Sequence, residues 1–175
     1  LVTSAGVSVA PFVSTVGSAP STVCGFMRLS HKGKKLLLST YNGTGTNLYL
    51  YDFDNSTGAV SNEVDVTAAP AIARLKPYSG EFSPDDKLFY VGYSGGIDQF
   101  QTSAPAATQY KVFNNPSKVA ELQMGPDCKI YCASENGATS ISVISNPNRA
   151  GAACNYIAGA IPLAPGQICK NGLPN

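Results

Sequence analysis

The chain has 175 residues, of which 43% are hydrophobic and 13% charged, so it is long enough to bury one ordinary core. Its 12 basic and 11 acidic residues give a net charge of +1, and the basic residues cluster only at 32–35. This balance excludes nucleic acid and anionic membranes as electrostatic partners. No apolar run approaches the ~20 residues of a membrane span.

Residues 1–23 alternate Val and Phe with small polar residues, which predicts one or two edge strands. Four strands are then expected within residues 24–66, with a turn at 54–58: Gly25–Leu29, Lys35–Thr40, Asn47–Asp52 and Val60–Val66. The segment 67–78 contains two prolines and is expected to be a connection.

Residues 79–119 contain a hairpin signal at 94–96, between expected strands at Leu88–Tyr93 and Ile97–Thr102. Residues 120–163 are expected to form a further unit whose later strands are Lys129–Ala133, Thr139–Ser145 and Tyr156–Ile161. Residues 164–175 are expected to lead into a next unit. No helical periodicity persists beyond one turn, so the sequence predicts an all-β fold.

One phrase occurs three times: an apolar segment, a turn rich in Ser, Gly, Pro and Asp, a Lys and a second apolar segment. Its copies lie at 26–39, 80–91 and 122–133, and the turns begin 53 and 42 residues apart, at Ser30, Ser83 and Gly125. Such periods predict propeller blades of four antiparallel strands. We therefore expect a β-propeller segment with blades at 24–66, 79–119 and 120–163, and with 1–23 as the outer strand or strands of a preceding blade.

Three blades do not make a closed ring, since closed propellers have four to eight. The sequence is therefore expected to be part of a larger propeller whose remaining blades lie on the same or another chain. The alternative is an open stack whose edges a partner covers.

The third repeat resembles the blade pattern of large secreted bacterial surface proteins associated with gliding motility and type IX secretion, which carry YVTN/WD40-like repeats. The residues that carry this resemblance are LQMGPDCKIY at 122–131, ISNPN at 144–148, GAACNY at 151–156 and GLPN at 172–175. The resemblance implies an extracellular or cell-surface propeller that acts within a larger surface or filament assembly. Cys128 departs from the pattern, which has Gly there, and is expected to shift the turn type.

Five cysteines leave at least one unpaired within the chain. Cys128 and Cys132 would lie about 13 Å apart along a strand, too far for a disulfide. Cys154 and Cys169 bracket a loop-rich tail and are the candidate structural disulfide, which would favour an extracytoplasmic location. The alternative is that both are small buried hydrophobic residues. The spacing fits no zinc pattern, and no cofactor is expected.

No catalytic constellation is found. His31, the only histidine, is expected to be an exposed turn residue, and the turn aspartates to cap their own backbone: Asp85, Asp86 and Asp127. Asp52, Asp54, Ser56 and Glu63 fall at positions 1, 3, 5 and 12 of a calcium loop. However, Gly58 comes one position late, so a hairpin turn is the favoured interpretation.

Tyrosines at alternating strand positions are expected to pack between blades rather than to form a glycan-stacking platform. The favoured function is therefore a non-catalytic secreted scaffold or interaction module, with a surface protein or glycan as its partner. The alternative is a lactonase or lyase type of enzyme acting at the central opening, which needs His, Glu or Asp on the innermost strands. Those strands carry Arg28, Glu81 and Gln123.

Overall fold

The computed structural model describes residues 2–4, 6–7, 12–17, 24–41, 46–68, 76–93, 95–114, 119–134, 137–170 and 172–173. This part of the chain is almost entirely β-structure. Its helical turns are short 3-10 segments: η1 (Val66–Ala68), η2 (Pro105–Ala107) and η3 (Gly151–Cys154). The predicted all-β fold is therefore confirmed.

The described strands form three four-stranded antiparallel sheets. The first sheet contains β3 (Cys24–Leu29), β4 (Lys35–Tyr41), β5 (Thr46–Asp54) and β6 (Ala59–Asp65). The second contains β7 (Pro77–Phe82), β8 (Leu88–Tyr93), β9 (Gly96–Gln101) and β10 (Tyr110–Asn114). The third contains β11 (Val119–Met124), β12 (Ile130–Ser134), β13 (Ser140–Ile144) and β14 (Tyr156–Pro162).

In each sheet the strand order follows the chain, so each strand pairs with the next one in the sequence. The pairing of β8 with β9 runs without a shift from Leu88 opposite Gln101 to Tyr93 opposite Gly96. Gly95 and Gly96 both adopt positive φ at this hairpin, which explains why the glycines close it. The expected strand boundaries agree with the observed ones to within two residues here.

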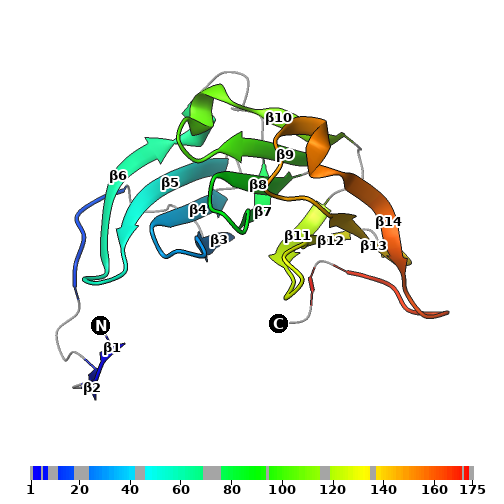
Figure 1. The fold of residues 1–175 in the computed structure, drawn as a ribbon, viewed down its shortest axis with the longest axis horizontal. Helices are drawn as coiled ribbons and strands as arrows, with labels where there is room; N and C mark the ends of the chain where they lie inside the picture. The colour runs from blue at the N-terminus through cyan, green and yellow to red at the C-terminus, as the bar shows by residue number, and fades with distance from the viewer. Residues whose placement is uncertain are drawn as a thin grey trace.

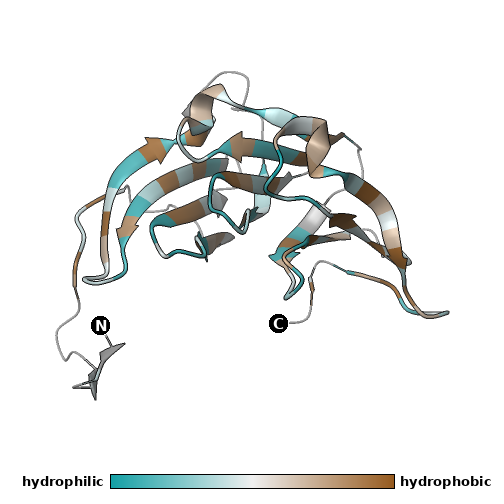
Figure 2. Ribbon diagram, viewed as in Figure 1, coloured by the Kyte–Doolittle hydropathy of each residue, from teal (hydrophilic) through white to brown (hydrophobic). Residues whose placement is uncertain are grey.

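The three sheets stand side by side in a fan, and their first strands β3, β7 and β11 lie next to one another (Figure 1). Figure 2 shows hydrophobic residues concentrated along the strands and hydrophilic residues at many of the turns. No closed ring is formed by the described residues. Strands β1 (Val2–Thr3) and β2 (Gly6–Val7) pair with each other and join none of the three sheets.

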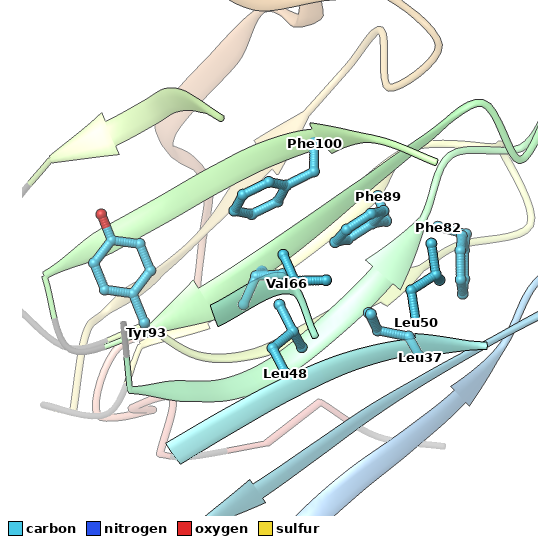
Figure 3. Close-up of a cluster of buried hydrophobic side chains, with 9 residues drawn as sticks. Leu37, Leu48, Leu50, Val66, Phe82, Phe89, Tyr93 and Phe100 are labelled. Atoms are coloured by element: carbon cyan, nitrogen blue, oxygen red, sulfur yellow. The ribbon is translucent and has the colours of Figure 1, made fainter. Parts of the chain in front are cut away.

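Two hydrophobic clusters hold the sheets together. The cluster between the first and second sheets is drawn in Figure 3 and contains buried side chains of both sheets and of η1: Leu37, Leu48, Leu50, Val66, Phe82, Phe89, Val91, Tyr93 and Phe100. The cluster between the second and third sheets contains Leu88, Tyr90, Ile97, Leu122, Ile130, Cys132, Ile144 and Cys154. The second sheet is thus covered on both faces, which explains why β8 is buried along its whole length.

No helix in the described ranges is both long enough and apolar enough to cross a membrane.

Candidate functional site along the first strands

The first strands carry one polar residue at the same place in each repeat, two positions before the turn. These residues are Arg28 on β3, Glu81 on β7 and Gln123 on β11. We call them the first-strand row. Because β3, β7 and β11 meet where the sheets converge, this row is where an enzyme of the lactonase or lyase type would carry its catalytic groups.

Glu81 is the buried member of the row, with a side chain only 3% exposed. One of its carboxylate oxygens, Oε2, accepts a hydrogen bond from the Met124 backbone N–H at 3.1 Å. The other, Oε1, accepts one from the Phe82 N–H at 3.0 Å. Arg28 Nε lies 3.6 Å from Oε2 and donates to the Gly80 carbonyl at 3.4 Å. The carboxylate therefore joins all three sheets.

His31 lies in the turn after β3 and is exposed, as expected. Its ring is nevertheless placed against the second sheet, with Nε2 3.3 Å from the Phe82 carbonyl oxygen and 3.9 Å from Glu81 Oε1. No local motif could predict this proximity, because His31 and Glu81 are 50 positions apart in the sequence. The arrangement thus brings an imidazole and a buried carboxylate together, with Nε2 and Oε1 3.9 Å apart.

The turn that follows β3 in the first sheet is hydrogen-bonded to the turn that follows β7 in the second. The carboxylate of Asp86 accepts hydrogen bonds from the backbone N–H groups of His31 at 2.9 Å and Lys32 at 2.8 Å. Lys32 Nζ donates to the Asp85 carbonyl at 3.0 Å. Asp85 does cap its own turn, since its Oδ1 accepts from the Lys87 N–H. Asp86 instead bridges two sheets, which the sequence did not reveal.

Cys128 is the fourth residue of the third turn and has a φ of 61°, close to the values of 62° at Gly33 and 63° at Asp86, the fourth residues of the other two turns. The expected change of backbone conformation at Cys128 is therefore not seen. The third turn differs instead in length, because the Gly125 N–H donates to the Lys129 carbonyl, whereas the Ser83 N–H donates one residue further along, to Leu88.

The residues that matched a calcium loop are not gathered around a common point. Asp52 pairs with Lys35 Nζ at 2.5 Å and accepts from Asn62, while Asp54 accepts from the Ser56 N–H and hydroxyl. These Ser56 hydrogen bonds lower the pKa of Asp54 to about 2. Glu63 accepts a hydrogen bond from the Tyr51 hydroxyl. The hairpin interpretation is thus confirmed, with a turn between β5 and β6. Among the described residues no group of three His, Cys, Asp or Glu is arranged to hold a metal ion.

Four tyrosines of the described residues are buried: Tyr49, Tyr51, Tyr90 and Tyr93. Tyr93 and Tyr90 belong to the two clusters between the sheets, which confirms packing between the repeats for these two. Tyr49 and Tyr51 alternate with Leu48 and Leu50 and therefore point to the opposite face of the first sheet. The side chain of Tyr41 lies outside the described part. Tyr131 is half-buried, and its hydroxyl donates to Asp127.

Tyr90 also fixes the third sheet to the second. Its hydroxyl donates to the Pro147 carbonyl at 2.8 Å and accepts from Gln99 Nε2 at 2.7 Å. Gln99 also donates to the Arg149 carbonyl and accepts from the Gly151 N–H. Both sheets meet here through the connection between β13 and β14, so the NPN turn has a structural role.

Asp98 is a second buried carboxylate, fully removed from solvent on β9. The Tyr93 hydroxyl donates to it at 2.9 Å, and Gln109 Nε2 donates to its other oxygen. Burial raises the pKa of Asp98 more than these donors lower it. The group lies within the second sheet, away from the first-strand row.

The predicted Cys154–Cys169 disulfide is not formed in this structure, where both thiols are free. Cys154 ends η3 beside Asn146, while Cys169 pairs with Ala138 beyond the other end of β13. From Ala138 to Ile144 a strand spans about 20 Å, whereas bridged Cα atoms lie within ~7 Å. Cys128 and Cys132 are also free, one exposed and the other buried.

No family model and no curated protein matches the chain. Similar solved structures include two of the extracellular domain of BT4673 from B. thetaiotaomicron. The first, named as a one component system, is 13% identical with a TM-score of 0.45 and covers 71% of this chain. The second, named as a hybrid two component system, is 14% identical with a TM-score of 0.43 and covers 67%. The matches span only 15% and 14% of those chains.

Proposed function

We propose that this chain is part of a β-propeller that serves as a non-catalytic extracellular interaction module in a larger surface assembly. Its three described sheets are the blades, and β3, β7 and β11 are the innermost strands. The three repeated phrases, the low charge and the resemblance to secreted surface proteins support this proposal.

The observation that carries the non-catalytic part of the proposal is the state of Glu81. A general acid or base must reach a substrate. Glu81 instead is buried, and both its oxygens accept backbone N–H groups of the protein itself. Arg28, its ionic partner, also contacts the second sheet. The polar groups nearest the centre thus serve to join blades, and recognition is assigned to the exposed loops.

The experiment tests binding and turnover on the same samples. The purified chain is applied to a glycan array, and separately incubated with lactones and with uronate-containing polysaccharides. The proposal predicts binding without turnover, and binding that persists in His31→Ala, which removes the exposed ring beside Glu81. Turnover that is lost in His31→Ala would overturn the proposal and favour the lactonase or lyase type of enzyme.

A further inference from the structure

The first sheet leaves apolar side chains of its first strand exposed, whereas equivalent residues of the other two sheets are buried. Phe26 packs against the cluster between the first and second sheets, and Arg28 points the same way to Gly80. Since side chains alternate along a strand, Met27 and Leu29 point to the opposite face. They are 68% and 42% exposed.

The equivalent residues of the other sheets are covered by a neighbouring sheet. Leu122 lies three positions before its turn, as Met27 does, and is fully buried against the second sheet. Phe82 lies one position before its turn, as Leu29 does, and is fully buried against the first sheet. Met27 and Leu29 therefore occupy the positions through which the second and third sheets each pack on the sheet that precedes them.

The backbone N–H groups of β3 and β11 are also equivalent. On β11 the N–H groups of Leu122 and Met124 donate to Ser79 Oγ and Glu81 Oε2 of the preceding first strand. On β3 the Ser30 N–H donates inward to Lys35, as the Gly125 N–H does to Lys129. The alternation of a strand then directs the N–H groups of Met27 and Leu29 to the outer edge of β3.

The third sheet presents the complementary face. Glu121 and Gln123 lie four and two positions before their turn, as Ser79 and Glu81 do. Glu121 Oε2 already accepts the Leu173 N–H of the same chain at 2.7 Å, so Gln123 is the acceptor that this face offers to a partner. Ile157, opposite Val143 in the pairing of β13 with β14, points to the same face and is 43% exposed.

We propose that a second copy of the chain occupies the Met27 and Leu29 face, packing there with the Gln123 and Ile157 face of its third sheet. Gln123 accepts the Leu29 N–H across this contact, as Glu81 accepts that of Met124. Two copies joined twice in this head-to-tail manner supply six sheets, within the four to eight of closed propellers. The inference rests on the blade arrangement in the proposed function, but it concerns assembly rather than ligand binding.

The test is the oligomeric state of the purified chain and of two variants, measured by sedimentation and light scattering over a range of concentrations. Met27→Lys disables one face and Ile157→Lys the other, and each is expected to weaken self-association by about tenfold or more. Tyr110→Lys is the matched control, since Tyr110 is 39% exposed on β10 of the second sheet, which belongs to neither face. It is expected to associate like the wild type.

Mixing the two face variants decides between head-to-tail and face-to-face contact. Each retains one intact face, so the mixture is expected to form a one-to-one complex that neither forms alone. A wild-type monomer at all concentrations would overturn the proposal, as would association that Met27→Lys abolishes and Ile157→Lys leaves unchanged. Loss of glycan binding with intact dimers would count only against the proposed function.

Discussion

The buried carboxylate of Glu81 accepts a hydrogen bond from the backbone N–H of Met124, 43 residues further along the chain. One strand of the second sheet thereby holds the first strand of the third. Arg28 reaches the same carboxylate from the first sheet. The Glu81 carboxylate therefore packs the three repeats together and holds their first strands in register.

Glu81→Gln is expected to lower the free energy of unfolding by about 1–3 kcal/mol, because an amide offers only one acceptor to two buried N–H groups. Urea denaturation of both proteins measures the difference. Glu63→Gln is the matched control, since Glu63 is exposed and its amide still accepts from Tyr51, and should change stability by less than about 0.5 kcal/mol. Equal effects of the two changes would show that burial of Glu81 is not the reason.

Asp98 should make the stability of the protein fall as pH rises. Burial raises its pKa in the folded state above the ordinary value of 3.8, so the folded protein holds the proton more tightly than the unfolded chain. The favourable contribution is complete below pH 3.8 and is lost as pH rises through the raised pKa.

Asp98→Asn, which retains an acceptor for the Tyr93 hydroxyl, is the variant for this comparison. Denaturation of both proteins from pH 3 to pH 7 should show the wild type losing stability relative to the variant as the pH rises. A difference that does not depend on pH, or one of opposite slope, would contradict the prediction.

Glycine substitutions at Asp86 and Cys128 should have opposite effects, although both residues adopt the same left-handed φ. Cys128→Gly removes backbone strain at an exposed position and should raise the free energy of unfolding by up to about 1 kcal/mol. Asp86→Gly also relieves strain but loses the acceptors of the His31 and Lys32 N–H groups, so it should be the less stable variant. Thermal denaturation ranks them, and the reverse order would refute the role of Asp86.

The four cysteines whose side chains the structure describes should react with iodoacetamide in an order set by burial. Cys128 is exposed and should react first in the native protein. Cys132 is buried, and burial raises the pKa of its thiol, so it should react only after unfolding. Peptide mapping of pulse-labelled samples reads this order. Recovery of a Cys154–Cys169 linked peptide without reduction would contradict the separation of these residues by the length of β13.

The turns and strands were predictable because their causes are local. A hairpin glycine, a turn serine and an alternation of apolar residues act within a few positions, so β8 and the turn at Ser83 agree closely with expectation. The polar character of Arg28, Glu81 and Gln123 was also visible. The contacts that Arg28 and Glu81 make with other repeats were not visible, because they join residues far apart in the sequence.

The sequence by itself determined three antiparallel four-stranded units, since the repeated phrase contains the turn chemistry and the strand pattern of each. Only the tertiary structure decided what the repeats do to one another. It placed Asp86 on the Lys32 backbone, His31 against Phe82, and Cys154 far from Cys169. These contacts depend on how whole sheets stack, and packing of apolar faces over tens of residues leaves no signal at the spacing of a local motif.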